Sequence, residues 1–281
     1  MCAIFGLGFM KGHKVNSTEM VRAIVRRLFV ENQIRGRTAS GLALINSSVF
    51  HVVKKDVCGE DLITLPEYEK AERQYMVFSD LPEGEKGEVI AKEPPISFIG
   101  HCRLKTKGSE LDNVNNHPIV RDDVVGVHNG MIGNDDRIFN IYSKTFKRNG
   151  RVDSEIIFAL IEHFSKNDDR PIHKAVQKTS LALRGGMACA FAHRRQPHLV
   201  WLFRRGGPCD INIYRDVGML AWSSSRHFIE NSVKGYEDVL GKAELVGLEE
   251  GEGMSIDLYR NYIYRFSMPH YGADNNALSA V

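Results

Sequence analysis

The chain opens with MCAIFG at residues 1–6, which places a cysteine directly after Met1. The run CAIFGLGF at residues 2–9 has no charged or strongly polar side chain, and it predicts a strand that is buried on both faces. On this stretch alone, Cys2 is interpreted as a small apolar residue at the start of that strand. The alternative interpretation is a reactive thiol, because removal of Met1 would leave Cys2 with a free α-amino group.

A thiol attacks a carbonyl group only as its thiolate, and a cysteine with an ordinary pKa of about 8.5 needs a base at neutral pH. The α-amino group of Cys2 would have a reference pKa of about 7.7–8.0 and could act as that base, directly or through water. Cysteine is also small enough for routine excision of a preceding methionine. The sequence therefore permits a nucleophile and its base at one residue.

The composition is that of an ordinary globular protein. The chain has 281 residues, of which 43% are hydrophobic and 26% charged, so it can bury a substantial core. A net charge of +2 argues against a protein whose main task is to neutralise nucleic-acid phosphates. The five cysteines form no C-x-x-C pair and no zinc-type spacing, which favours a reducing setting. With no signal peptide or membrane-spanning stretch apparent, we expect a cytoplasmic protein without membrane or nucleic-acid partners.

Hydrophobic periodicity predicts the first elements after the opening strand. The segment 16–36 predicts an amphipathic helix, with Asn16 and Glu19 as a capping box. Its apolar face is expected to consist of Val21, Ile24, Val25, Leu28 and Phe29. LALI at 42–45 and SSVFHVV at 47–53 predict a hairpin. Residues 58–95 lack clear periodicity and are expected to form a surface excursion with one short helix.

The second half of the chain contains two more predicted helices and several strands. DSEIIFALIEHF at 153–164 predicts a helix capped by Asp153 or Ser154. A third helix is expected to start near Pro171 and to be stopped by Gly185 and Gly186. Short strands follow up to residue 267. Many strands and few helices favour an α+β fold with helices on the outer faces of sheets. We expect one domain over residues 2–268 and a polar tail at 269–281.

Polar residues follow the apolar parts of two predicted strands, ISFIGHCR at 96–103 and VVGVHNG at 124–130. Asn129 and Gly130 offer a side-chain amide and a backbone N–H without a Cβ beside it, which suit a developing oxyanion. Asn-Gly is also typical of a simple turn. Arg103 could bind a substrate carboxylate and Asp153 a substrate ammonium group. The alternatives are a surface ion pair and a helix cap.

Six motifs occur together in a fixed order: MCAIFG (1–6), RGRTASG (35–41), GHCRLKTKG (100–108), NNHPIV (115–120), VHNGMIGN (127–134) and VDSE (152–155). In these motifs the chain resembles the class II glutamine amidotransferase domain, an N-terminal-nucleophile (Ntn) hydrolase. It is most similar to the glutaminase domain of glutamine–fructose-6-phosphate transaminases. The resemblance covers residues 2–155 and continues weakly to about residue 230. It implies a four-layer αββα sandwich.

The resemblance assigns roles to individual residues. Cys2 would be the nucleophile and its amine the proton carrier, while Asn129 and Gly130 would form the oxyanion hole. Arg103 would bind the α-carboxylate of glutamine and Asp153 its α-ammonium group. The other residues that match the family are Arg35, which would pack by the nucleophile and help to close the site, Thr106, which would line the pocket, and His101, His117 and His128, which would have supporting roles.

Three positions depart from the family pattern. Thr38 stands where an aspartate is usual, Leu104 where an aromatic residue is usual, and Lys107 where a small residue or histidine is usual. Leu104 and Lys107 lie in the segment expected to cover bound glutamine. We therefore expect these two substitutions to affect glutamine affinity and closure of the segment.

The implied activity is hydrolysis of the glutamine side-chain amide through a thioester on Cys2, which yields glutamate and ammonia. No phosphosugar, phosphoribosyl or nucleotide-activating domain is recognised after the glutaminase-like part, so a separate enzyme or synthase subunit is expected to accept the ammonia. The half-reaction needs no cofactor, and the sequence has no metal-ligand spacing. Two alternatives remain: a hydrolase of another γ-glutamyl amide, and a non-catalytic glutamine-binding interaction module.

Overall fold

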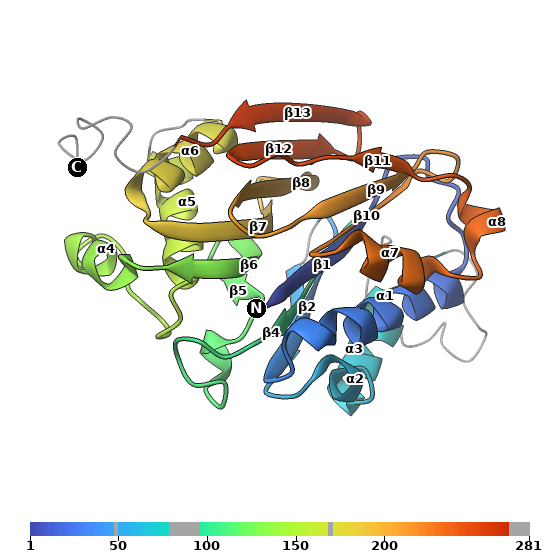
Figure 1. The fold of residues 1–281 in the computed structure, drawn as a ribbon, viewed down its shortest axis with the longest axis horizontal. Helices are drawn as coiled ribbons and strands as arrows, with labels where there is room; N and C mark the ends of the chain where they lie inside the picture. Colours follow the sequence, from blue (N-terminus) through green and yellow to red (C-terminus); the bar gives the residue numbers. More distant parts are fainter. Residues whose placement is uncertain (48–49, 79–95, 168–170, 270–281) are drawn as a thin grey trace.

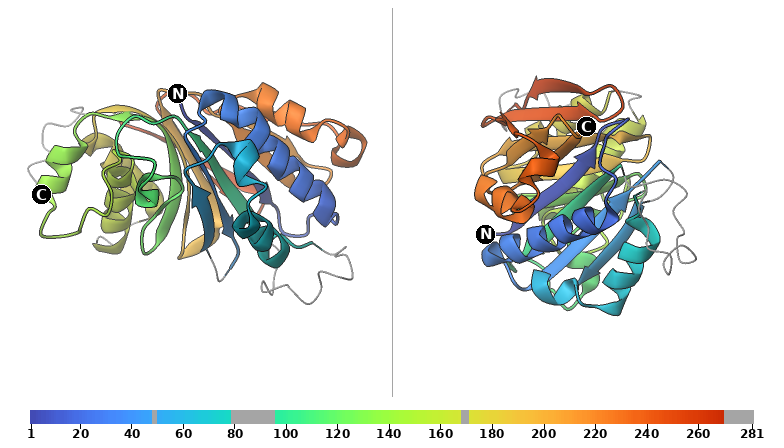
Figure 2. Two further views of the ribbon diagram at one scale, coloured as in Figure 1. Left: turned by 90° about the horizontal axis from the view of Figure 1, so that it is seen from below. Right: turned by 90° about the vertical axis from the view of Figure 1, so that its right-hand side faces the viewer.

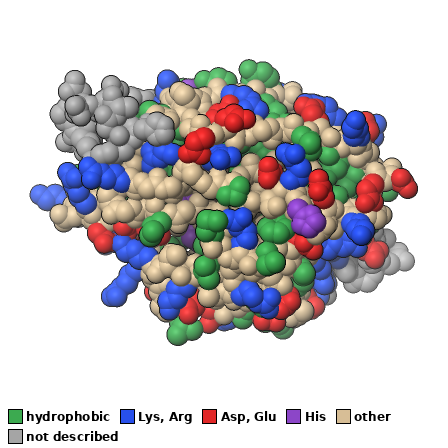
Figure 3. Space-filling model, viewed as in Figure 1, with side chains coloured by type: hydrophobic (Ala, Val, Ile, Leu, Met, Phe, Trp, Pro, Cys, Tyr) green, Lys and Arg blue, Asp and Glu red, His purple; other side chains and the backbone are tan. Residues whose placement is uncertain are grey.

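The computed structural model describes residues 1–47, 50–78, 96–167 and 171–269 (Figure 1). Two antiparallel sheets face each other, and helices cover the outer face of each sheet, which gives four layers (Figure 2, left). The four-layer α+β sandwich expected from the sequence is confirmed. None of the described helices is long and apolar enough to cross a membrane. Positive and negative side chains are interspersed over the face drawn in Figure 3.

The first sheet contains seven strands in the order β11-β9-β10-β1-β4-β2-β3. Its strands are β1 (Ala3–Phe9), β2 (Ala39–Ile45), β3 (Phe50–Lys55), β4 (Ser97–Arg103), β9 (Asp210–Tyr214), β10 (Met219–Ser223) and β11 (Glu244–Val246). β1 lies in the middle, where it pairs with β10 on one side and β4 on the other. The start of the chain is therefore fixed between two neighbouring strands.

The second sheet contains six strands in the order β13-β12-β8-β7-β6-β5. Its strands are β5 (Ile119–Val120), β6 (Val124–Ile132), β7 (Gly185–His193), β8 (Gln196–Arg205), β12 (Glu252–Asp257) and β13 (Tyr262–Ser267). β6 pairs with β7 along its whole length, and it also contacts β1 and β4 across the space between the sheets.

The helices divide between the two outer faces. Those on the seven-stranded sheet are α1 (Thr18–Asn32), α2 (Gly59–Leu62), α3 (Pro66–Tyr75), α7 (Arg226–Val233) and α8 (Glu237–Leu240). Those on the six-stranded sheet are α4 (Asp135–Ile141), α5 (Glu155–Asn167) and α6 (Ile172–Ala182). Two short 3-10 turns, Gln33–Arg35 and Asn113–Asn115, complete the described helical elements.

A separate apolar layer fills the space between the sheets. Ile4 of β1, Ile99 of β4 and Val127 of β6 belong to it. Successive side chains of a strand point to opposite faces, so residues two positions away along each strand face the same space. By this alternation Cys2 and Asn129 lie at one end of the inter-sheet layer.

Two local predictions at the start of α1 and in the following excursion need correction. The helix is capped by Ser17, whose hydroxyl accepts a hydrogen bond from the Met20 N–H at 3.1 Å, so the predicted Asn16–Glu19 capping box is wrong. Ser17 offers the same capping chemistry one residue later. The predicted apolar face of this helix is buried as expected. Residues 58–78 form two helices rather than one, and the buried Tyr68 packs into the core; residues 79–95 lie outside the described chain.

Two further boundaries differ from the prediction. α6 ends at Ala182, and Gly185 and Gly186 begin strand β7 rather than stopping the helix. β6 does not end at Asn129 and Gly130 but continues to Ile132, so this Asn-Gly pair is part of a paired strand and not a turn. Of the predicted tail, residues 270–281 lie outside the described chain.

Candidate active site

Cys2 lies immediately before β1 and meets the segment that follows β4. Its thiol donates to the Leu104 carbonyl at 3.4 Å, and the Leu104 N–H lies 3.3 Å from the same sulfur. Burial raises the pKa of the Cys2 thiol, although the backbone hydrogen bond from Leu104 and the charge of Arg103 oppose this rise. A thiol with a raised pKa needs a nearby base before it can act as a nucleophile.

Arg35 holds the main chain of Cys2 rather than its thiol. Its Nε donates to the Cys2 carbonyl at 3.1 Å, and another guanidinium nitrogen lies 3.5 Å from the carbonyl oxygen of Ser224. The 3-10 turn after α1 places Arg35 beside the ends of β1 and β10. The structure thus brings Arg35 next to Cys2.

Arg103 is the last residue of β4, and its side chain is buried. The guanidinium donates to Asn116 Oδ1 at 2.8 Å and to the carbonyls of Lys107 and Gly108 at 2.7 and 2.9 Å. A guanidinium has five N–H groups. Nε–H and one further N–H therefore have no partner among the described residues. The Arg103 carbonyl accepts from both the N–H and the hydroxyl of Thr38, so Thr38 secures the end of this strand.

We call residues 104–108 the covering segment. Leu104 and Thr106 are exposed on it, so Thr106 lies at the rim of the site rather than in its interior. Lys107 reaches across to the first turn of α4, where its ammonium group lies 2.6 Å from Asp135 and 2.9 Å from Asp136. The segment therefore connects the seven-stranded sheet to the element that follows β6.

Asn129 and Gly130 lie within β6, opposite Ala188 and Met187 of β7. The Asn129 side chain is buried, and its Nδ2 has no hydrogen-bond partner in the described part of the chain. A buried side-chain donor is almost always paired in a native protein, so an unpaired one needs an explanation. Gly130 has a φ of +156°, and a Cβ at this position would lie 2.1 Å from the Gly186 carbonyl oxygen. Only glycine fits there.

Asp153 lies next to the last residue of β6 and comes two residues before α5 in the chain. Its carboxylate accepts a hydrogen bond from the Ile132 N–H at 2.7 Å, and its side chain is buried. The charge of Asp153 adds to the rise that burial causes in the pKa of the Cys2 thiol. Asp153 is thus held at the end of β6, three residues beyond Asn129.

The three histidines have scaffold positions. His101 Nε2–H donates to the His128 carbonyl at 3.1 Å and so joins β4 to β6 one residue before Asn129. His117 stacks on His101 with ring centroids 4.1 Å apart, and neither of its ring nitrogens has a partner among the described residues. His128 points to the other face, where its Nδ1 lies 2.8 Å from the Ser154 hydroxyl and its Nε2 3.2 Å from the Gly186 carbonyl.

Burial keeps all three imidazoles neutral near pH 7. It lowers the pKa of His101 to about 3, and it lowers the pKa of His117 well below the ordinary range. It also lowers the pKa of His128, although Asp153 opposes this change. Neutral, buried rings of this kind support the strands and do not carry a charge at the site.

Two asparagines in the NNHPIV motif have roles that the sequence prediction missed. Asn116 accepts from Arg103, as described above. Asn115 Oδ1 accepts from the N–H groups of Arg151 and Val152, at 2.6 and 3.2 Å, and so positions the loop that carries Asp153. Adjacent asparagines in a polar stretch before His-Pro were the available signal. Their partners are distant in the chain, however, and could not be read from it.

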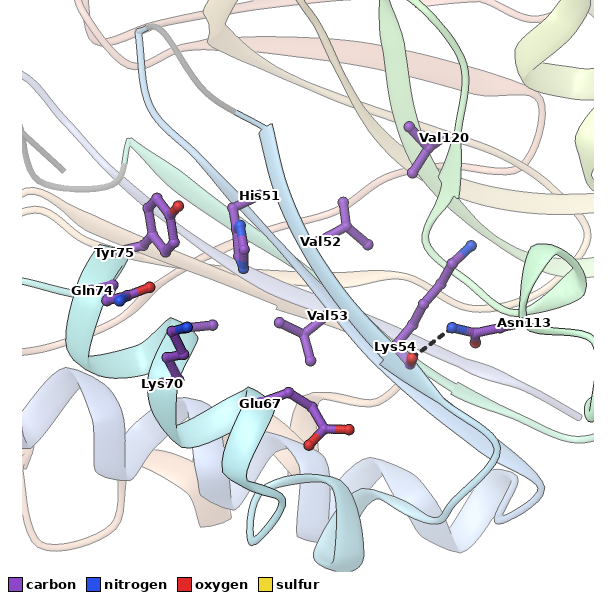
Figure 4. Close-up of a pocket in the computed structure, with 11 residues that line it drawn as sticks. His51, Val52, Val53, Lys54, Glu67, Lys70, Gln74, Tyr75, Asn113 and Val120 are labelled. Carbon is purple, nitrogen blue, oxygen red and sulfur yellow. Dashed lines mark hydrogen bonds between the residues drawn. The ribbon is translucent and has the colours of Figure 1, made fainter. Parts of the chain in front are cut away.

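Two further features bear on the nature of the site. Within the described ranges, no group of three or more acidic, histidine or cysteine residues could hold a metal ion. A groove of about 660 Å³ lies between β3 and α3, lined by His51, Lys54, Lys70 and Tyr75 among others (Figure 4). None of its lining residues is a predicted site residue.

Sequence comparisons find similar proteins over part of the chain. No protein-family model matches the chain. Over 162 residues, 56% of the chain, it is 27% identical to a glutamine–fructose-6-phosphate aminotransferase of Streptococcus pneumoniae. Over 111 residues, 39% of the chain, it is 32% identical to the enzyme of the same name from Aliivibrio fischeri. The matches span 27% and 18% of these relatives, so the chain corresponds to about a quarter of their length or less.

Solved structures share the fold over nearly the whole chain. Glutamine phosphoribosylpyrophosphate amidotransferase from B. subtilis superimposes with a TM-score of 0.63 over 95% of this chain and 49% of its own, at 15% identity. A structure described as the allosteric regulatory enzyme of purine biosynthesis gives a TM-score of 0.65 with the same coverage and identity. The chain is thus similar to class II glutamine amidotransferases, in sequence over about half of its length and in fold over nearly all of it.

Proposed function

We propose that the protein is a glutaminase with Cys2 as its nucleophile, once Met1 has been removed. The Cys2 thiolate attacks the side-chain amide carbon of glutamine, and the freed α-amino group takes the thiol proton. The same amine then protonates the leaving nitrogen, so that ammonia departs and a γ-glutamyl thioester remains. Water hydrolyses this thioester to glutamate and restores the thiol.

The unpaired amide of Asn129 is the observation that carries this proposal. The first step places negative charge on the amide oxygen of glutamine, and a preorganised donor is most effective where that charge develops. Asn129 Nδ2 is buried and without a partner in the described chain, and Gly130 follows it in a conformation that only glycine accommodates. A free donor at the same end of the inter-sheet layer as the Cys2 thiol suits acyl transfer.

Glutamine would be held at its α-carbon by opposite charges. The free N–H groups of Arg103 suit the α-carboxylate and Asp153 suits the α-ammonium group. Thr106, exposed on the covering segment, would contact the substrate from the rim. This arrangement leaves the side-chain amide directed toward Cys2.

We further propose one glutaminase domain over residues 2–268, with a separate enzyme or synthase subunit as the ammonia acceptor. In support, β9, β10 and β11 return to the first sheet after β5 to β8 have built most of the second, so both halves of the chain contribute to both sheets. The relatives are named for transfer to fructose 6-phosphate and phosphoribosyl pyrophosphate, but neither acceptor is assigned to this chain. The five free cysteines support a reducing, cytoplasmic setting.

The test is glutamate release from glutamine, compared with release from larger γ-glutamyl amides. We expect glutamine to be preferred and Cys2→Ala to be inactive, with Cys58→Ala as a matched thiol control that retains activity. A strong preference for a larger amide would instead support the other γ-glutamyl hydrolase. Glutamine binding without turnover, in protein that has lost Met1, would support the non-catalytic module.

A further inference from the structure

One side chain, that of Lys107, attaches the covering segment to the six-stranded half of the sandwich. The Lys107 ammonium group lies 2.6 Å from Asp135 and 2.9 Å from Asp136 at the start of α4. Arg148 lies on the other side of the same two carboxylates and is held in turn by the carbonyls of Gly150 and Arg151. Asp135 is only 4% exposed, so this bridge is anchored on a buried carboxylate rather than a free surface charge.

Two main-chain anchors already join the covering segment to the nucleophile side. The Leu104 backbone contacts the Cys2 thiol, and the carbonyls of Lys107 and Gly108 accept from Arg103. Both anchors lie on the seven-stranded sheet or at its end. Among the hydrogen bonds and ion pairs described for residues 104–108, only those of the Lys107 side chain reach α4, the helix that follows β6.

We propose that Lys107 is a positioning residue that holds the covering segment in place over the site before glutamine binds. The inference rests on the proposed glutaminase function and deepens it. Ordering a segment on binding reduces affinity, so a segment already fixed by the protein preserves that affinity. Lys107 also fixes the carbonyls that orient Arg103, the proposed ligand of the α-carboxylate.

Lys105 offers a matched control in the same segment. Its ammonium group lies 2.7 Å from Glu110, which is a local contact that does not reach α4. Lys105 and Lys107 are therefore two lysines with comparable short ion pairs, of which only Lys107 spans the two halves. A general effect of removing positive charge would be the same at both positions.

The first test measures KM and kcat for glutamine in Lys107→Met, Lys107→Arg and Lys105→Met. We expect Lys107→Met to raise KM by about tenfold with kcat within about twofold of wild type, because binding and not chemistry is affected. Lys107→Arg should restore most of the affinity, and Lys105→Met should match wild type. An unchanged KM in Lys107→Met, or an equal rise in Lys105→Met, would overturn the proposal.

The second test is amide hydrogen exchange of residues 104–110 without glutamine. We expect faster exchange in Lys107→Met than in wild type and no change in Lys105→Met, since local opening governs exchange. Equal exchange in all three proteins would refute the positioning role. This measurement does not depend on turnover. If the wild-type protein hydrolyses no glutamine but exchange of residues 104–110 is still faster in Lys107→Met, the result would count against the proposed function and not against the positioning role of Lys107.

Discussion

The two sides of the site differ in how their polar groups are satisfied. On the seven-stranded sheet, the Cys2 thiol, the Arg35 guanidinium and three N–H groups of Arg103 already have partners within the protein. On the six-stranded sheet, Asn129 Nδ2 is buried with no partner among the described residues. In the proposed mechanism, the first side holds Cys2 and Arg103 in place, and the second keeps the Asn129 donor free. Groups that stabilise a transition state must be available for charge that does not exist in the resting protein.

We expect the largest effect from Gly130→Ala, which places a side chain next to the free donor of Asn129. Its Cβ would lie 2.1 Å from the Gly186 carbonyl oxygen, and the φ of +156° disfavours any side chain. β6 and β7 would have to separate, so we expect activity to fall by at least about 10³-fold and the free energy of unfolding to fall by several kcal/mol. Turnover assays and denaturant unfolding measure both effects.

Gly133→Ala is the matched control for this substitution. A Cβ at Gly133, just beyond the end of β6, would meet nothing within 4 Å. We expect its activity and stability to equal those of wild type. Comparable losses in both variants would mean that Gly130 has no special place in the site.

Asn129→Ala removes the free donor without introducing a clash. We expect kcat to fall about 10²- to 10³-fold, the usual cost of losing one oxyanion donor. The free energy of unfolding should change little, because the amide nitrogen that is removed makes no hydrogen bond in the described chain. Asn129→Asp, which keeps the size but replaces the donor by an acceptor, should be at least as slow. Near-normal kcat in both variants would remove Asn129 from the mechanism.

Arg103→Lys tests the seven-stranded side of the site, where the polar groups already have partners. A lysine cannot make the forked contacts to Asn116, Lys107 and Gly108 together. We expect KM for glutamine to rise more than kcat falls, with about 1–3 kcal/mol lost from the free energy of unfolding. A substitution that changed kcat alone would contradict a binding role for Arg103.

The smallest expected effect is on the pH dependence of stability. His117 is buried and neutral in the folded protein, with its pKa well below the ordinary value. As pH falls below about 6.5, the unfolded chain binds a proton at this position and the folded chain does not, so stability falls. His117→Phe should reduce the slope by about 1.4 kcal/mol per pH unit between pH 6 and 5. Identical slopes in denaturant titrations would show that His117 is protonated in the folded state.

Much of the framework could be predicted from local sequence. The apolar stretch after Cys2 predicted a buried strand, and the structure confirms it as β1. The α1 apolar face, the hairpin of β2 and β3 and the layered α+β arrangement followed from periodicity as well. These features depend on spacing along a single segment, which is visible without knowing the fold.

The site could be predicted only in part, because its contacts join distant segments. Asn129 and Gly130 were identified by chemistry, but their place inside a paired strand depends on β7, more than 50 residues later. Lys107 appeared only as a departure from a pattern, since its partners on α4 are brought near by the fold. The capping of α1 by Ser17 instead of Asn16 shows that local sequence cannot always fix a helix boundary, because adjacent residues can have similar capping propensities.

In the proposed mechanism, Cys2, freed of Met1, carries the γ-glutamyl group while Asn129 stabilises its formation. The most direct test is mass spectrometry of the N-terminal peptide after acid quenching during turnover of glutamine. We expect a peptide that begins at Cys2 and carries the mass of one γ-glutamyl group, and we expect this added mass to be absent in Cys2→Ala. Turnover of glutamine by protein whose N-terminal peptide still begins with Met1 and carries no such group would contradict it.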